Sequence, residues 1–210
     1  MKRQGFTLAE LTITIALTFL LGMCVFLVIM PSFRIAAEGQ IRTELQQQGQ
    51  LALQQVTTDL QGSVSNGVTL IAPSGSQGMI MACHPLSAST QLSGLPSFTP
   101  KLQVWWHDLA KTQLWRRNFV NGNPPTGLTL AFETTQPLKP TNAQLISIVS
   151  ATSPGTKSYA LSVIKFEVDQ ETASGGEIYA LRIVLSKVIP GKKANAVVEL
   201  FRKVMQRNHY

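Results

Sequence analysis

The sequence predicts an α+β protein in which a long N-terminal helix packs on an antiparallel β-sheet head. Three observations lead to this fold class. An almost uncharged apolar run covers residues 6–30, an amphipathic helical pattern covers residues 31–65, and short β-rich runs separated by turn residues fill residues 66–210. We therefore divide the chain into a leader over residues 1–5, a transmembrane helix, an amphipathic helix and a β-rich globular head.

The apolar run is long enough to cross a membrane. At ~1.5 Å per residue, a helix over residues 6–30 reaches roughly 38 Å, whereas the hydrocarbon core of a bilayer is ~30 Å thick. Its one charged residue is Glu10. The basic leader in front of it, with Lys2 and Arg3, predicts a cytoplasmic N-terminus, so the head lies on the other side of the membrane.

The start of this run contains a motif. It reads Gly5-Phe6-Thr7-Leu8-Ala9-Glu10-Leu11 and resembles the class III signal of type IV pilins and the related pseudopilins. The resemblance implies that a prepilin peptidase cuts after Gly5 and that Phe6 becomes the N-methylated first residue of the mature chain. It also implies that Glu10 takes part in filament assembly and that the fold is pilin-like.

Elementary physical chemistry also singles out Glu10. A carboxylate at membrane depth costs ~2.5–3.5 kcal/mol on insertion scales, so such a residue is expected to have a partner. Cleavage after Gly5 would free the amine of Phe6 about one helical turn away, and the resemblance implies that Glu10 neutralises this amine on a neighbouring subunit. The alternative is that Glu10 merely lies in the headgroup zone at the helix end, where the helix dipole favours a carboxylate.

A conventional secretory signal and a plain signal anchor are the alternatives to the pilin-like motif. A secretory signal has an apolar core of about 7–15 residues followed by a small-x-small cleavage site. Here the apolar run is longer, and the candidate exit, Ile35-Ala36-Ala37 after Arg34, fits such a site poorly.

Residues 32–64 have the pattern of an amphipathic helix. Pro31 is expected to end the membrane run or to kink it, because proline lacks the backbone donor and clashes with the preceding turn. Gly39 and Gly49 each cost ~1 kcal/mol relative to alanine, so we expect the helix to be weak or bent there. The apolar face that should pack on the sheet consists of Ile41, Leu45, Gly49, Ala52, Val56, Leu60 and Val64.

The helical period ends at a turn signal, Ser63-Val64-Ser65-Asn66-Gly67. The β-rich runs behind it are expected to form antiparallel hairpins with one covered face. The clearest loops between them are 121–127 and 173–176. The predicted strands are 68–72, 79–83, 102–107, 113–119, 128–133, 145–150, 162–168, 178–187 and 197–205.

The sequence has no apparent catalytic constellation, and we expect a structural protein without enzymatic activity, cofactor or metal. Cys83-His84 is the one adjacent nucleophile–base pair, and neighbours on a strand point to opposite faces. Cys83 is predicted to be a buried free thiol. Asp169, Glu171 and Glu177 border a loop and are the candidates for a hard cation such as calcium, but the motif of the calcium-binding pseudopilins is not evident.

Three tryptophans and two arginines allow two interpretations. Trp105, Trp106, Trp115, Arg116 and Arg117 form either a stacking platform for single-stranded nucleic acid or, as we favour, a set with one tryptophan of each pair in the core and with solvated arginines. A basic region near the C-terminus could contact DNA, anionic lipid or an acidic neighbouring subunit, and an ordinary solvated surface is the simpler account. It consists of Lys187, Lys192, Lys193, Arg202, Lys203 and Arg207.

Looser similarities extend the resemblance to larger minor pilins of the J or W type. They involve residues 51–61, a predicted hairpin and the late runs 179–187 and 197–207. The hairpin consists of Val104-Trp105-Trp106 and the following run Leu114-Trp115-Arg116-Arg117. The resemblance implies a structural minor subunit, at the tip or in priming, of a type IV pilus or a type II secretion pseudopilus.

The resemblance also implies partners and a location. The partners are prepilin peptidase, other pilin or pseudopilin subunits, the inner-membrane assembly platform and membrane lipid, with DNA as a less favoured partner. The location is the bacterial inner membrane, crossed once with the head outside the cytoplasm, and later the filament or cell surface. The alternatives are a pilus-associated adhesin or DNA-uptake receptor and, with less support, a membrane-anchored extracytoplasmic enzyme.

Overall fold

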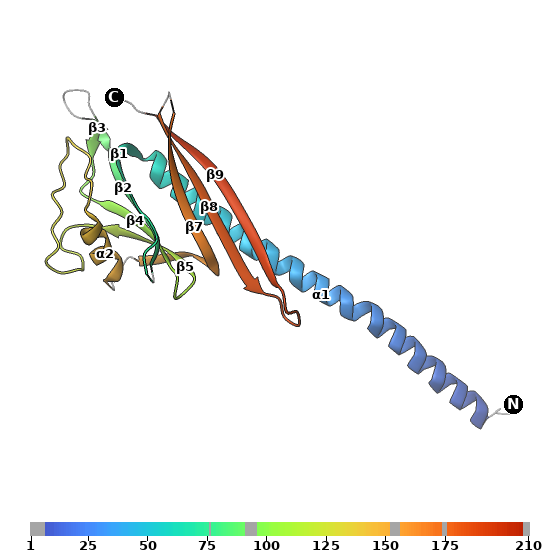
Figure 1. The fold of residues 1–210 in the computed structure, drawn as a ribbon. Coiled ribbons are helices and arrows are strands. Elements are labelled where there is room, and N and C mark those ends of the chain that lie inside the picture. Colours follow the sequence, from blue (N-terminus) through green and yellow to red (C-terminus); the bar gives the residue numbers. More distant parts are fainter. Residues whose placement is uncertain (1–6, 76, 91–95, 152–155, 174–175, 208–210) are drawn as a thin grey trace.

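The computed structural model describes the chain except residues 1–6, 76, 91–95, 152–155, 174–175 and 208–210. It confirms the α+β fold class: a long helix projects from one side of a β-rich head (Figure 1). The described elements in chain order are α1 (Leu8–Gln61), β1 (Ser63–Ile71), β2 (Gln77–Thr90), β3 (Pro96–Phe98), β4 (Leu102–Asp108), β5 (Gln113–Phe119), α2 (Asn142–Ser150), β6 (Thr156–Leu161), β7 (Val163–Ala173), β8 (Gly176–Val188) and β9 (Asn195–Arg207).

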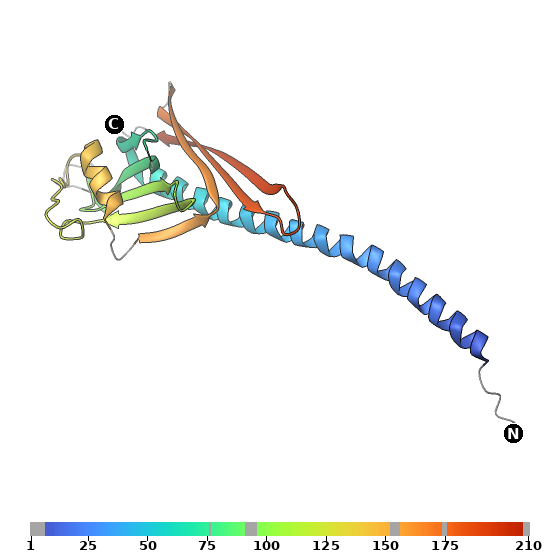
Figure 2. The same cartoon turned by 60° about the horizontal axis from the view of Figure 1, so that its bottom comes forward.

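The helix α1 is a single α-helix of 54 residues, roughly 80 Å long at ~1.5 Å per residue. Pro31 lies inside it, so the expectation that Pro31 ends the membrane run is wrong. If the helix ended at Pro31, several backbone carbonyl groups beside an apolar stretch would lack hydrogen-bond donors. Leaving these groups unpaired costs more free energy than the one backbone hydrogen bond that is lost when the helix continues through proline. The helix also continues through Gly39 and Gly49, and it bows gently along its length (Figure 2).

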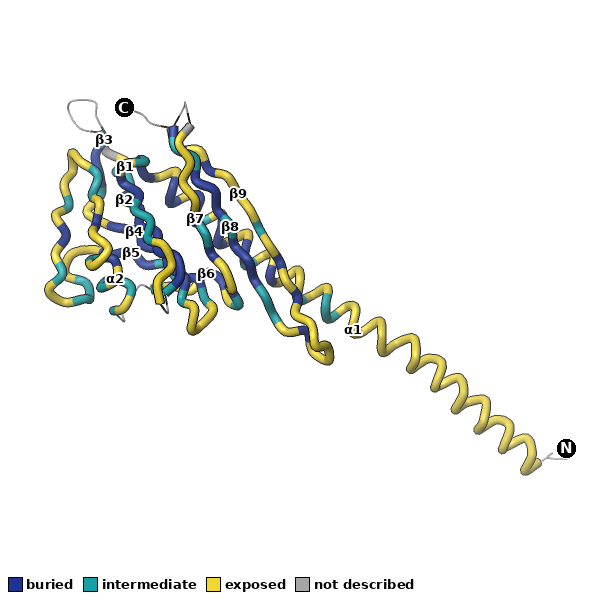
Figure 3. Tube along the Cα trace, in the orientation of Figure 1, coloured by how far each residue is buried: buried dark blue, intermediate teal, exposed yellow. Residues whose placement is uncertain are grey.

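The N-terminal part of α1 lies largely outside the head. Every residue from Thr7 to Ala36 is exposed, including the large apolar side chains (Figure 3). Within the part of the chain that the structure describes, α1 is the one helix long and apolar enough to cross a membrane. An apolar surface of this extent is unfavourable in water, so the chain is suited to single-pass membrane anchoring.

The C-terminal part of α1 belongs to the main core of the head. The predicted apolar face is buried at Leu45, Gly49, Ala52, Val56 and Leu60. Ile41 packs at the edge of this core, whereas Val64 lies on β1 and not on the helix. A Cβ atom at Gly49 would overlap the side chains of Leu185 and Leu200. The missing side chain therefore lets β8 and β9 approach the helix closely.

The strands form two sheets where one was expected. The larger sheet has the order β1-β2-β4-β5-β6, with β3 paired to β2, and the smaller has the order β7-β8-β9. All these pairs are antiparallel. The main core combines side chains of both sheets with those of α1. The helix therefore packs against both sheets.

The predicted turn at residues 63–67 is wrong, because β1 begins directly after the helix. The Ser63 hydroxyl donates to the Leu60 carbonyl at 2.9 Å, and the Gln206 amide donates to the carbonyls of Leu60 and Ser63. These bonds join the end of α1 to the end of β9. The pairing register of β1 with β2 shifts between Ser63 and Val68, and this irregularity contains the turn-forming residues.

The second face of the larger sheet is covered by α2, where a strand at 145–150 was predicted. Helix formation has a local cause: Thr141 and Gln144 form a capping box at the N-terminus of α2, which satisfies two backbone donors reciprocally. Leu145 and Ile148 then point into a second core with the apolar residues of β2 and β4.

The strand predicted at 128–133 is also absent from the described structure. This segment lies in extended loop structure and is fixed by Asn121, whose side-chain amide accepts from the Leu130 N–H at 2.9 Å and donates to the Leu130 carbonyl at 2.8 Å. Leu130 is thereby buried in the second core without a strand ladder.

The remaining predicted strands exist, and the prediction for β5 matches its bounds. The predictions for β4, β8 and β9 agree within two residues at each end, whereas β1, β2 and β7 extend five to seven residues beyond the predicted bounds at one end. β3 and β6 are additional. The predicted loop at 121–127 is confirmed. In the loop predicted at 173–176, residues 174 and 175 lie outside the described residues, and its two ends are strand residues of β7 and β8.

The close approach at Gly49 predicts a position-specific effect of side-chain size. We expect Gly49→Leu to lower the free energy of unfolding by about 1–3 kcal/mol, since the added atoms overlap the β8 and β9 leucines. The matched control is Gly39→Leu, where a Cβ meets nothing within 4 Å, and it should be neutral or stabilising by up to ~1 kcal/mol. Denaturant unfolding of the full chain in detergent, followed by tryptophan fluorescence, measures both. Equal effects would contradict the packing described here.

Candidate functional site

The N-terminus of α1 is closed by a capping box that contains Glu10. The Glu10 Oε2 atom accepts from the Thr7 N–H at 2.9 Å and from the Thr7 hydroxyl at 2.9 Å, and the Thr7 Oγ1 accepts from the Glu10 N–H at 3.3 Å. In the single chain the carboxylate is therefore turned back onto its own helix start, where the helix dipole also favours it. Gly5 and Phe6, the predicted cleavage site, lie outside the described residues.

The hydroxyl groups of the apolar stretch are satisfied inside the helix. Thr12, Thr14 and Thr18 donate to the carbonyls of Leu8, Glu10 and Thr14 at 2.7–2.8 Å. Such bonds remove the cost of placing a hydroxyl in hydrocarbon. Glu10 differs from them because its charge remains whether or not its oxygens accept hydrogen bonds.

One face of the exposed helix is hollowed around Gly22. The hollow measures about 680 Å³, and its lining is almost wholly apolar. Its residues lie one or two turns apart: Thr14, Ile15, Thr18, Phe19, Gly22, Met23 and Phe26. A small residue between larger apolar ones allows another helix to approach closely within a membrane.

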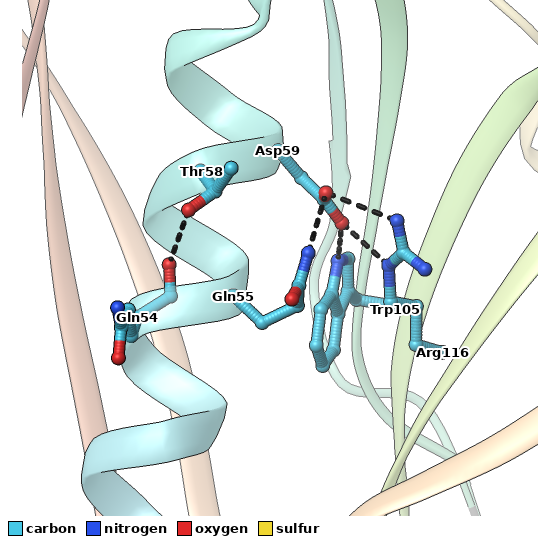
Figure 4. A network of polar contacts seen from close by, with 6 residues as sticks. All are labelled: Gln54, Gln55, Thr58, Asp59, Trp105 and Arg116. Carbon is cyan, nitrogen blue, oxygen red and sulfur yellow. Dashed lines mark hydrogen bonds and ion pairs between the residues drawn. The ribbon is translucent and has the colours of Figure 1, made fainter.

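A buried polar network fastens the other end of α1 to the head (Figure 4). Asp59 Oδ2 accepts from the Trp105 indole N–H at 2.8 Å and from Arg116 Nε at 2.6 Å, and Asp59 Oδ1 accepts from Arg116 Nη2 at 3.0 Å. Gln55 donates to the same carboxylate at 3.3 Å. The Asp59 side chain is 3 % exposed and that of Arg116 is 14 % exposed. A bidentate pair shielded from water in this way fixes both distance and rotation.

The predictions from sequence missed this network, although a local signal for it exists. Asp59 follows Val56 by three residues and precedes Leu60, so it flanks a face that is otherwise apolar. A carboxylate in this position needs a charged partner when it is buried. Which residue supplies the partner depends on the pairing of β4 with β5, which places Trp105 opposite Arg116.

The neighbouring arginine is buried too. Arg117 is 1 % exposed, and its guanidinium donates to the carbonyls of Ile148 at 2.6 Å, Ala151 at 3.1 Å and Pro124. Burial lowers the pKa of Arg117, while carbonyls at the C-terminal end of a helix favour a cation. The expectation that both arginines are solvated is therefore wrong. Arg116 binds α1, and Arg117 binds the end of α2.

The three tryptophans do not form an open stacking surface. Trp105 and Trp106 are both buried, so the expectation that one of this pair is partly exposed is wrong. The ring of Trp105 is covered by Arg116 and Tyr159. The rings of Trp106 and Trp115 face each other at a centroid distance of 6.3 Å. The ring of Trp105 is therefore covered by other groups of the protein, whereas Trp106 and Trp115 line a pocket of about 330 Å³.

Cys83 and His84 point to opposite faces of β2, as expected for neighbours on a strand. Cys83 is a free, buried thiol of the main core, as predicted, and burial raises its pKa. His84 is buried against Phe98 and Phe132. Its Nδ1 accepts from the Leu138 N–H at 2.8 Å, so its Nε2 carries the proton and donates to the Thr99 carbonyl at 2.7 Å. The two side chains are therefore not assembled as nucleophile and base.

Two of the three acidic residues proposed for a cation, Glu171 and Glu177, are engaged by protein groups. Glu171 pairs with Lys203 at 3.6 Å, and Glu177 accepts from the Tyr179 hydroxyl at 2.8 Å. Within the described ranges, no group of three or more histidine, cysteine or acidic residues is placed to hold a metal ion.

Several basic residues of the C-terminal region bind acidic residues in the structure. Lys187 pairs with Glu44 at 2.8 Å, and Lys192 pairs with Glu38 at 2.5 Å. Both ion pairs join the β8–β9 hairpin to α1. The basic region thus serves partly to hold the helix, which reduces the positive charge that it offers to other partners.

No protein-family model, no curated protein and no solved structure matches this chain. Its function is therefore inferred from its own residues and their geometry.

The Asp59–Arg116 pair predicts a large loss of stability when one partner is removed. We expect Asp59→Asn to lower the free energy of unfolding by about 3 kcal/mol, because a shielded guanidinium then lacks its counter-charge. The double variant Asp59→Asn with Arg116→Met should recover part of this loss. Urea unfolding of the full chain in detergent provides the values.

The control for Asp59→Asn is Glu199→Gln, which removes the exposed ion pair of Glu199 with Arg182. This change should cost less than ~1 kcal/mol, because exposed pairs contribute little. If Asp59→Asn costs no more than Glu199→Gln, the network does not anchor the helix.

The hydrogen bonds of His84 predict that stability decreases in acid. Burial lowers the pKa of His84, and also that of His107, below the unfolded value of about 6.5. The unfolded chain then binds more protons than the folded chain, so the stability present above pH ~6.5 is lost as the pH falls toward the folded pKa. Protonation of His84 would place a second N–H against the Leu138 N–H. Unfolding measured from pH 7.5 to 5 should show this slope, and His84→Gln should reduce it. A slope unchanged in this variant would exclude His84 as its source.

Proposed function

We propose that the protein is a structural subunit of a type IV pilus or type II secretion pseudopilus and that it assembles through α1. One observation carries the proposal: the Gly5–Glu10 motif runs into the first turn of a single helix with two different surfaces. The N-terminal surface of this helix is apolar and exposed, and the C-terminal surface is the core of the head. A filament subunit needs such a helix, because it passes from the membrane into a helical bundle while its head stays folded.

In this proposal prepilin peptidase hydrolyses the bond between Gly5 and Phe6, and the freed amine of Phe6 is then methylated. Glu10 rests in its capping box with Thr7 in the single chain. In the filament it would turn to the amine of a neighbouring subunit, where opposite charges compensate each other in apolar surroundings. The hollow around Gly22 offers a place for a neighbouring helix.

We further propose that the chain resides in the bacterial inner membrane with its head outside the cytoplasm. The exposed apolar part of α1 and the basic residues Lys2 and Arg3 of the leader support this orientation. The partners in this location are the peptidase, the assembly platform and other pilin or pseudopilin subunits.

Within the filament we propose a minor role at the tip or in priming, as in minor pilins of the J or W type. The head has two sheets, and a second layer formed by α2 and the 128–133 segment covers the larger one. A head of this bulk suits the end of a filament better than a densely repeated shaft. Uniform labelling of the subunit along purified filaments would contradict this assignment.

The alternatives have less support. A DNA receptor would present a continuous surface of unpaired cations, whereas Lys187 and Lys192 form ion pairs with α1, and the ring of Trp105 is covered by Arg116 and Tyr159. For an enzyme, Cys83 and His84 are the nucleophile and base that stand side by side in sequence, and their side chains point apart.

The proposal predicts a defined N-terminus. Membrane-expressed protein should begin at Phe6 with added methyl mass when a prepilin peptidase is present, and at Met1 when it is not. Intact mass and N-terminal sequencing measure this directly. A chain that stays whole with the peptidase, or that is cut near Ala37, would overturn the proposal.

Glu10→Gln separates processing from assembly in the same experiment. We expect normal cleavage of this variant but a loss of at least about tenfold in the amount recovered with sheared filaments, because the amide cannot neutralise an amine. If the Glu10→Gln variant is incorporated normally, Glu10 has no role in assembly. The prediction of cleavage after Gly5 would be unaffected by that result.

A further inference from the structure

A second hollow lies where α1 leaves the membrane and meets the β8–β9 turn. It measures about 380 Å³ and is formed by the helix between Phe26 and Ile35 together with Lys192 of the turn. Its lining is mostly apolar, and the charged groups that line it, Arg34 and Lys192, are both cations.

The position of this hollow along the helix corresponds to a membrane surface. No charged residue occurs between Glu10 and Arg34, and this interval spans roughly 36 Å of helix, slightly more than a hydrocarbon core of ~30 Å. Arg34 is the first charged residue after the apolar run, so it lies at the membrane surface on the side of the head. The apolar lining around Phe26 and Met30 is then at the depth of acyl chains, and the two cations are at the depth of headgroups.

The ion pairs around the hollow hold Lys192 in place without using all of its donors. Glu38, one turn beyond Arg34, accepts from Lys192 Nζ at 2.5 Å and from Arg42 at 3.0 Å. A lysine ammonium has three N–H donors, so Lys192 keeps two for a further acceptor. Arg34 is exposed and forms no ion pair with any described residue. Lys193 adds another exposed cation to the same turn.

We propose that this hollow binds an anionic phospholipid of the leaflet that faces the head. One acyl chain packs along the helix at Phe26, Leu27 and Met30, and the phosphate lies between Arg34 and Lys192. Two cations and no carboxylate line the hollow itself, which favours a headgroup with net negative charge over one that carries its own cation. A bound lipid would fix how high the head stands above the membrane, because the β8–β9 turn is tied to α1 through Glu38.

The proposal rests on the membrane span alone. It does not depend on cleavage after Gly5 or on assembly into a filament, so it can fail or succeed separately from the proposed function. A neighbouring helix is the other conceivable occupant of an apolar hollow, and the experiment below distinguishes the two.

The test uses the full-length chain in detergent micelles, titrated with dioleoylphosphatidylglycerol or with dioleoylphosphatidylcholine. Native mass spectrometry counts the lipids bound to each molecule. We expect one phosphatidylglycerol to bind more tightly than phosphatidylcholine. Arg34→Gln should weaken the binding of phosphatidylglycerol about fivefold, and the double variant Arg34→Gln with Lys192→Gln should weaken it about 30-fold. These are the losses expected when one or two basic contacts to an anionic lipid are removed. Arg34 is exposed and forms no ion pair with a described residue, so Arg34→Gln should leave the stability of the head unchanged, which denaturant unfolding checks.

The matched control is Lys101→Gln with Lys139→Gln, which removes the same charge from exposed positions near β4 and α2. This variant should bind phosphatidylglycerol like the unchanged chain. Three results would overturn the proposal: equal binding of the two lipids, equal weakening in the control, or a protein dimer that Arg34→Gln dissociates while lipid binding stays unchanged.

Discussion

The structure depends on one continuous helix whose two halves need different surroundings. Over its first half α1 exposes apolar side chains that hydrocarbon or another helix would cover, and over its second half it packs in the main core of the head. An uninterrupted helix meets both demands because its backbone hydrogen bonds are internal and independent of the surroundings. A break at Pro31 would place unpaired carbonyl groups at the boundary, so the helix passes through it.

The head is built to hold this helix at a fixed height and rotation. Gly49 allows β8 and β9 to lie close, and the Asp59–Arg116 pair joins the helix to β5 on its other side. The ion pairs of Lys187 and Lys192 add contacts with α1 at Glu44 and Glu38, nearer to its exposed apolar part. Apolar contact alone permits sliding and rotation, whereas a bidentate ion pair shielded from water has one favourable geometry.

Side-chain alternation, turn residues and helix caps explain where prediction from the sequence succeeded in the head and where it failed. Strands that alternate and lie between turn residues, such as β4 and β5, were predicted with nearly their observed bounds. The region 145–150 failed because its apolar run fits a strand or a helix equally, and the capping box of Thr141 and Gln144 decides for the helix. The region 63–67 failed because turn-forming residues can also fill an irregular strand when partners such as Gln206 satisfy its backbone.

The sequence by itself determined a helix long and apolar enough to cross a membrane, the solitary charge of Glu10 within its apolar part, the apolar face from Leu45 to Leu60 and the α+β class. Each of these depends on residues close together in the chain. Only the tertiary structure decided that the strands form two sheets around the helix, that Asp59 pairs with Arg116, and that Arg34 and Lys192 line one hollow. These features join residues far apart in the chain. Their partners are set by strand register and by close packing, which composition and periodicity do not encode.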